Sequence, residues 1–153
     1  MKKYLILTIL IFTTFQGFSC ECPEMSIQKL DSISLENSDL LIIGEITAVD
    51  KNGYNIKIQQ TLKGNSVSKN IKGDYTDNPK YDANSCAFYP SKNGIYLLYL
   101  TEVNLQNEET YISSQCSGSR TMDGSVVPFA AFNMDKKELE TWTKQWINKI
   151  CEE

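Results

Sequence analysis

The chain has 153 residues, a formal net charge of −4 and no histidine. The absence of histidine excludes serine–histidine and cysteine–histidine catalysis, and it excludes every metal site that histidine would ligate. The acidic balance argues against a nucleic-acid partner, because proteins that bind nucleic acids carry basic surfaces. A binding protein is therefore favoured over an enzyme, and no cofactor is expected.

The N-terminus has the architecture of a secretory signal peptide. Two lysines precede an apolar run from Leu5 to Phe12, and the small residues Gly17 and Ser19 stand three and one positions before Cys20. The run is shorter than the roughly 20 residues that span a bilayer, which disfavours a membrane anchor. We predict that residues 1–19 are removed and that the exported chain begins at Cys20, with a formal charge of −6 once the two lysines are lost.

All cysteines fall in the predicted exported part, where oxidising conditions favour disulfides. They are Cys20, Cys22, Cys86, Cys116 and Cys151. None form a C-x-x-C pair, so zinc-ribbon and thioredoxin-like sites have no support. Because five is an odd number, one cysteine is free, intermolecular or modified.

The first half of the exported chain predicts one helix and then three strands. Apolar residues recur at helical spacing before Asn37, and apolar runs with later alternation follow. An Asn52-Gly53 step between two such runs is typical of a β-hairpin turn. The expected elements are a helix over Ser26–Asn37, strands over Leu40–Val49 and Tyr54–Leu62, and a weaker strand over Val67–Tyr75.

The second half predicts two more strands and a terminal helix. Residues Thr76–Pro90 are expected to form a loop, Ile95–Leu100 a buried central strand, Asn104–Glu109 a loop, Thr110–Ser113 a short strand and Ser117–Pro128 an irregular segment. Asp135 and Glu138 have the form of a helix capping box. Leu139, Trp142, Trp146, Ile147 and Ile150 then recur along one helical face. Two tryptophans on one face suggest a ligand site or core packing against the sheet, and core packing is favoured.

Five strands with a helix at each end indicate a mainly β domain with α additions. A small barrel or a sandwich fits this content, and barrel closure removes exposed strand edges. The sequence shows no repeats or linkers, so one domain over residues 20–153 is expected, as a monomer.

Several segments together resemble the N-terminal domain of tissue inhibitors of metalloproteinases and related netrin-like modules. Cys20-Glu21-Cys22-Pro23 resembles the family's Cys-x-Cys opening at the mature N-terminus. Ser38–Ile46 resembles the first strand, and Ile58–Gly64 resembles the second strand, which also closes on Lys-Gly. Ser85-Cys86, Gly94–Leu98 and Cys116 recur in the same order. The resemblance covers the chain from Cys20 to Cys116.

The resemblance implies an OB-type five-stranded β-barrel, in agreement with the strand count. It also implies disulfides from Cys20 to Cys86 and from Cys22 to Cys116, which leave Cys151 alone. The family's third disulfide has no first partner here, because Ser32–Ser38 contains no cysteine. The second, disulfide-rich module of the animal inhibitors is also missing from this sequence.

In the family that this sequence resembles, the N-terminal cysteine chelates the catalytic zinc of the target protease through its α-amino group and carbonyl oxygen. The chelate needs a free, neutral amine, which an α-amino pKa of about 8 makes accessible. It would occupy the open position of a catalytic zinc. Glu21 would point into the protease's specificity pocket, where a carboxylate is costly without a partner. Asn84 and Ser85 would form a second contact beside Cys20–Pro23.

A different role follows if Cys20 is lipidated. The other four cysteines could then pair completely, in one of three connectivities. An acylated Cys20 amine could not bind zinc, so the chain would be a membrane-tethered binding module of the cell envelope. Phe18, two positions before Cys20, disfavours this reading, because bacterial lipoprotein signals prefer small residues there. In either case the protein lies outside the cytoplasm.

Acidic side chains give only a weak signal for catalysis or metal binding. Glu45, Asp74, Asp77 and Asp82 could supply a carboxylate pair, but their spacing matches no motif. The segment from Asp74 to Asp82 lacks the alternating ligands and the central glycine of an EF-hand loop. Acidic residues of this kind are more often solvated turn formers.

Overall fold

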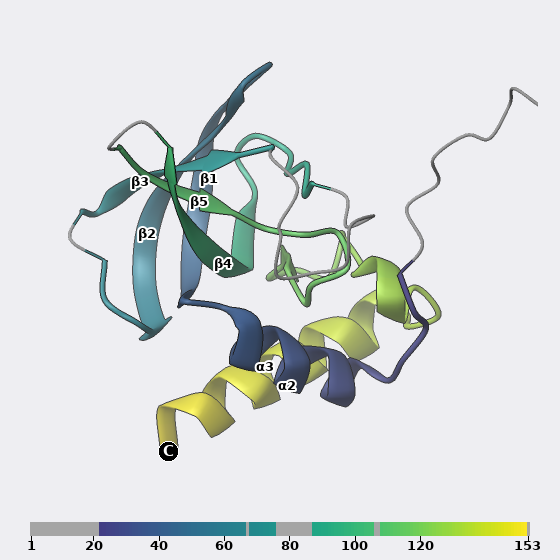
Figure 1. The fold of residues 1–153 in the computed structure, drawn as a ribbon. Coiled ribbons are helices and arrows are strands. Elements are labelled where there is room, and N and C mark those ends of the chain that lie inside the picture. The colour runs from purple at the N-terminus through teal and green to yellow at the C-terminus, as the bar shows by residue number, and fades with distance from the viewer. Residues whose placement is uncertain (1–21, 67, 76–86, 106–107, 153) are drawn as a thin grey trace, which may run out of the picture.

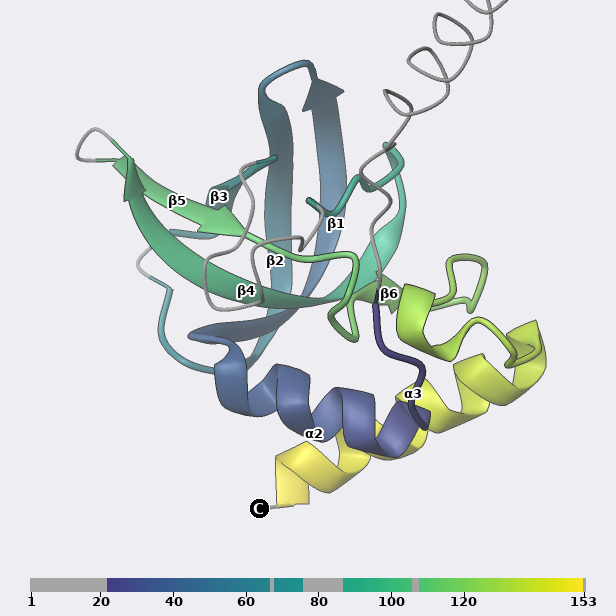
Figure 2. The ribbon, with the colours of Figure 1, turned by 45° about the vertical axis from the view of Figure 1, so that its right-hand side comes forward.

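A computed structural model describes residues 22–66, 68–75, 87–105 and 108–152. Over these residues the chain forms a closed barrel of mixed β-sheet, with two α-helices packed across one end of it (Figures 1 and 2). The predicted signal peptide lies outside the described residues. Within them, no helix combines the length and the apolarity that crossing a bilayer requires.

The barrel closes through the order β1-β2-β3-β5-β4, with β4 pairing back onto β1. The strands are β1 (Leu40–Asp50), β2 (Gly53–Lys63), β3 (Asn70–Asp74), β4 (Ile95–Leu105) and β5 (Glu108–Ile112). All neighbours are antiparallel except β3 and β5, which are parallel. The predicted fold class, a mainly β five-stranded barrel of OB type, is confirmed.

The hairpin between β1 and β2 forms where the sequence predicts it. Asp50 pairs with Gly53, and the Asp50 carboxylate accepts a hydrogen bond of 2.7 Å from the backbone N–H of Asn52. Gly53 also begins the pairing of β2 with β3, opposite Asp74. A Cβ atom at Gly53 would lie 2.2 Å from the carbonyl oxygen of Gly73, so this position requires glycine.

The expected strands differ from the observed ones mainly around β4. This strand continues beyond Leu100 to Leu105, and its second half pairs with β5, which begins at Glu108 rather than at Thr110. The expected loop over 104–109 is therefore mostly strand, because backbone pairing holds polar residues there. In the other direction, β3 spans only Asn70–Asp74, a shorter stretch than the predicted strand from Val67 to Tyr75.

Apolar side chains are buried on both faces of β1 and β4. Leu40, Ile42 and Leu98 point into the barrel, whereas Leu41 and Leu97 pack outside it against the helices. A strand that is buried on both faces gives an unbroken apolar run rather than an alternating one. This explains the two most apolar segments of the exported chain.

Both helices begin at side-chain caps. The Ser26 hydroxyl accepts from the backbone N–H of Lys29 at the start of α2 (Ile27–Asn37). Asp135 Oδ1 accepts from the N–H groups of Lys137 and Glu138, each at 2.9 Å, at the start of α3 (Lys136–Glu152). In the described chain the Glu138 side chain makes no return bond, so the expected capping box is only half formed.

Two short elements lie within or just after the segment Ser117–Pro128, which the sequence predicts to be irregular. Strand β6 (Arg120–Thr121) pairs with β4 beside Tyr96 and Leu97. A single 3₁₀ turn, η1 (Phe129–Ala131), packs its two alanines against α2 and α3. Both elements are too short for a periodic pattern to indicate them.

A buried ion pair between Asp31 on α2 and Arg120 on β6 joins the helices to the barrel. Both side chains are 0% exposed, and the guanidinium contacts both carboxylate oxygens, at 2.6 and 3.0 Å. Arg120 also donates to Thr143 Oγ1 on α3 at 2.7 Å and to the carbonyl oxygen of Gly118 at 2.8 Å. Helices α2 and α3, strand β6 and the turn at Gly118 therefore meet at one charge pair.

Two aromatic side chains donate further hydrogen bonds to the Asp31 carboxylate. The Tyr99 hydroxyl donates to Oδ1 at 2.8 Å, and the Trp142 indole N–H donates to Oδ2 at 2.7 Å. Trp146 donates in turn to the Tyr99 oxygen at 2.7 Å. Burial and the adjacent carboxylate raise the pKa of Tyr99, which keeps this phenol protonated as a donor. The favoured packing role of the tryptophans is thus observed, with the addition of specific hydrogen bonds.

Replacing Arg120 with methionine is expected to lower the free energy of unfolding by about 3–5 kcal/mol, because it leaves a buried carboxylate without its countercharge. Urea denaturation followed by circular dichroism measures this change. The exposed pair of Lys144 and Glu140 supplies a matched control. Lys144→Ala should leave the denaturation midpoint unchanged, and an Arg120→Met protein as stable as that control would contradict the central position of the buried pair.

Candidate functional site

The structure describes only part of the predicted contact region. Cys22 and Pro23 are described, and Pro23 is exposed. Cys20, Glu21, Asn84, Ser85 and Cys86 lie outside the described residues. The geometry of the site is therefore built from Cys22, Pro23 and the segments that surround them.

A disulfide joins Cys22 to Cys116, which are 94 positions apart in sequence and whose Cα atoms lie 5.2 Å apart. This is one of the two pairings that the resemblance implies. Next to it, the backbone N–H of Met25 donates to the carbonyl oxygen of Ala130 at 3.2 Å. Cys22 and Met25 also pack against the apolar cluster of α2, η1 and α3. The start of the described chain is consequently held by a disulfide, a backbone hydrogen bond and apolar packing.

Cys116 lies in a turn whose serine hydroxyls are bonded to one another. Ser113 contacts Ser119 at 2.8 Å, and Ser117 donates to the carbonyl oxygen of Ser114 at 2.7 Å; all four side chains are buried. The turn is also attached to α2, since the backbone N–H of Gly118 donates to Ser34 Oγ at 2.9 Å. The disulfide is therefore attached to a turn that is fixed by hydrogen bonds rather than to a free loop. We call this turn, residues 113–119, the disulfide platform.

Two exposed aromatic side chains lie beside this platform. Tyr89 and Phe129 are 62% and 56% exposed, and together with Gln115, the neighbour of Cys116, they line a small hollow of about 110 Å³. Large exposed aromatics are common in the centres of protein interfaces. Sequence reasoning missed both residues, because Tyr89 lies in the predicted loop over Thr76–Pro90 and Phe129 directly follows the segment Ser117–Pro128 that is predicted to be irregular. The sequence signal that could have indicated them is a pair of aromatic side chains in segments with no helical or strand periodicity.

Tyr89 is held in place by a stack of tyrosines that reaches the barrel core. Its ring stacks on Tyr75 with 4.5 Å between centroids, and Tyr75 contacts the buried Tyr54 at 5.7 Å. Burial raises the pKa of both Tyr54 and Tyr75, with smaller contributions from nearby acidic groups and tyrosines, so these phenols stay neutral. An exposed ring that is already ordered loses little entropy when a partner covers it.

The remaining candidate side chains do not gather into a site. Glu45 on β1 and Asp74 on β3 are separated by strand β2, and Asp77 and Asp82 lie outside the described residues. Within the described ranges, no three acidic or cysteine side chains come close enough to hold a metal ion. Cys151 is a free, exposed thiol near the end of α3, 3.9 Å from the Gln60 amide.

Comparison with known proteins adds no relative: no family model, no curated protein and no solved structure matches this chain.

Replacing both Cys22 and Cys116 with serine is expected to lower the free energy of unfolding by about 2–5 kcal/mol, because the bond closes a long loop in the unfolded chain. Thermal and urea denaturation of the exported protein measure the loss. Cys151→Ser serves as the control, since this thiol is exposed and unpaired. If the double variant were as stable as that control, the bond would not hold the chain start in solution.

Proposed function

We propose that this chain is an exported binding domain that inhibits a zinc metalloprotease through the backbone of Cys20. The free α-amino group and the carbonyl oxygen of Cys20 would chelate the catalytic zinc of the target. The proposal rests on the family resemblance of the sequence, and one structural observation supports it above the others. That observation is the Cys22–Cys116 disulfide, which fixes the chain two residues after the proposed zinc ligand.

The fixed chain start suits an inhibitor because binding would cost little ordering. A segment held by a disulfide, by a backbone hydrogen bond and by apolar packing is already in one conformation before a target arrives. Chelation by backbone atoms also needs no histidine, and the chain has none. The exposed Tyr89 and Phe129 would contact the surface of the target next to its active-site cleft.

The second proposed bond, from Cys20 to Cys86, agrees with the described neighbours of these two cysteines. Ala87, which follows Cys86, forms a β-bridge with Ser114, two positions before Cys116. Cys116 is in turn bonded to Cys22, two positions after Cys20. The described neighbours Ala87 and Cys22 are therefore linked through Ser114 and Cys116, which supports the proposed bond.

The lipid-anchored alternative requires a different bond. With Cys22 and Cys116 paired, complete pairing of the other cysteines would need a bond between Cys86 and Cys151. Cys151 lies next to Gln60 on β2, whereas the Cys116 turn leads into β6. Gln60, Ile43, Leu97 and Arg120 follow one another across the sheet. Three strand spacings of about 4.8 Å each therefore separate Gln60, beside Cys151, from Arg120, four positions after Cys116, so Cys151 lies away from the Cys116 turn.

Peptide mapping of the exported protein is expected to show three things: a free Cys20 amine, a bond from Cys20 to Cys86, and Cys151 alkylated by iodoacetamide without prior reduction. These results follow from the proposed pairing, in which Cys20 and Cys86 bond to each other and Cys151 is left as a free, exposed thiol. Mass spectrometry of the non-reduced digest measures all three. A diacylglyceryl group on Cys20, or a bond from Cys86 to Cys151, would contradict the proposed inhibitor and support the lipid-anchored module.

Adding one alanine before Cys20 is expected to raise the inhibition constant for a susceptible zinc endopeptidase by about 100-fold or more, which equals about 2.7 kcal/mol. The added residue converts the chelating amine into an amide and displaces it from the metal. Inhibition of peptide hydrolysis across a panel of purified zinc endopeptidases provides the measurement.

A protein with one alanine added after Glu153 is the matched control, because the C-terminus of α3 lies away from the disulfide platform (Figure 1). It should inhibit as the unextended chain does. Equal inhibition by both extended proteins would exclude chelation while leaving inhibition by another route. If the unextended protein inhibited none of the panel, the inhibitor proposal itself would fail.

A further inference from the structure

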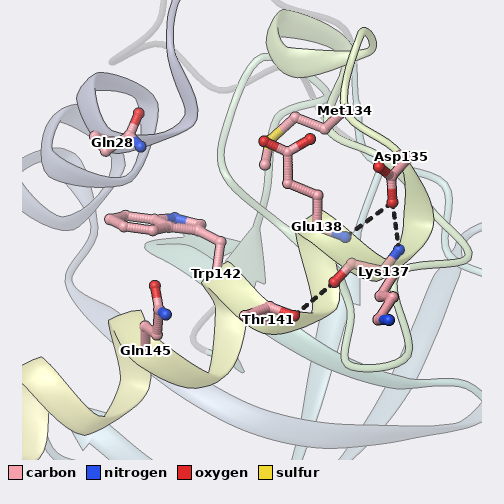
Figure 3. Close-up of a pocket in the computed structure, with 8 residues that line it drawn as sticks. All are labelled: Gln28, Met134, Asp135, Lys137, Glu138, Thr141, Trp142 and Gln145. Carbon is pink, nitrogen blue, oxygen red and sulfur yellow. Dashed lines mark hydrogen bonds between the residues drawn. The ribbon is translucent and has the colours of Figure 1, made fainter.

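We propose that the hollow between α2 and α3 is a binding site for a neutral carbohydrate, independent of the inhibitor site. The hollow has a volume of about 430 Å³, within the range of about 300–1,000 Å³ that is typical of small-molecule sites. Gln28 on α2 and Gln145 on α3 flank the indole of Trp142, with Glu138 and Thr141 beside them (Figure 3). The proposed site lies entirely within described residues.

Trp142 provides a fixed aromatic surface at this site. Its indole N–H is already bonded to Asp31 at 2.7 Å, and its ring stacks on Trp146 at 6.1 Å with an angle of 24°. Bonded at its edge and stacked on Trp146, the ring cannot turn away. What it offers a ligand is aromatic surface rather than a hydrogen bond. An aromatic face of this kind packs against the C–H groups of a pyranose ring, because its π-electrons attract their weakly positive hydrogens.

The polar side chains around the ring match hydroxyl groups. Each glutamine amide offers two donors and an acceptor, and a sugar hydroxyl can take either role. In the described chain, the side chains of Gln28, Gln145 and Glu138 make no hydrogen bond, so all three are available to a ligand. Each is exposed, which leaves it within reach of a molecule in the hollow.

The charge of the lining favours a neutral ligand over an anionic one. Asp135 and Glu138 outnumber Lys137, so the lining carries a net negative charge that disfavours phosphate, nucleotides and acidic sugars. The large apolar residues of the lining are Met134 and Trp142, which form an apolar surface bordered by amide and charged side chains. A neutral, hydroxyl-rich molecule with one apolar face fits the remaining chemistry.

Titration of the exported protein with methyl β-D-glucopyranoside, methyl α-D-mannopyranoside and N,N′-diacetylchitobiose tests the proposal. At least one of the three is expected to shift the tryptophan fluorescence and the indole N–H resonances saturably. The signal is specific, since both tryptophans of the chain lie on this face of α3. The absence of a saturable change with all three sugars at 50 mM would overturn the proposal.

The variant Gln28→Ala/Gln145→Ala is expected to weaken the binding at least tenfold, and Gln59→Ala is the matched control. Gln59 is an exposed glutamine on β2, away from the hollow, and its removal should change nothing. Equal affinity of the double variant and the control would overturn the assignment of the site. Sugar binding should survive the added alanine before Cys20, so failure here and failure of the inhibitor proposal can be told apart.

Discussion

The buried ion pair of Asp31 and Arg120 is the interaction on which the other contacts at this end of the molecule depend. Two charges taken out of water are costly, and their attraction offsets the cost only when the remaining donors and acceptors are also satisfied. Here the carboxylate accepts four hydrogen bonds, and the guanidinium reaches α2, α3 and the Cys116 turn. Because the pair needs all of these partners, it fixes the positions of the elements that carry them.

The proposed inhibitor site depends on this pair through the Cys116 turn. Gly118 donates to Ser34 on α2 and accepts from Arg120, so the turn is attached to the helix and to the ion pair at the same residue. The disulfide then transmits that fixed position to Cys22 and the chain start. In the proposed inhibitor, ordering the described start of the segment at Cys22 and Pro23 would cost little on contact.

The two proposed surfaces have different chemistry although they share the same support. Tyr89 and Phe129 present exposed aromatic rings beside the disulfide, which suits contact with another protein. The hollow over Trp142 presents one aromatic face among amides and a carboxylate, which suits a hydroxyl-rich ligand. Trp142 is itself bonded to Asp31, so the ion pair orders both surfaces. Because the two proposed surfaces are separate, both ligands could occupy one molecule at the same time.

Local patterns in the sequence determined the barrel strands, the Asn52-Gly53 hairpin and the helix that begins after Asp135, because apolar spacing, turn chemistry and capping act over a few residues. The Cys22–Cys116 bond could be predicted only from the family resemblance. Tertiary structure alone decided the pairing of Asp31 with Arg120, 89 positions apart, the extension of β4 through its pairing with β5, and the support of Tyr89 by Tyr75. Each of these is a contact between distant segments, and no local periodicity records which segments meet.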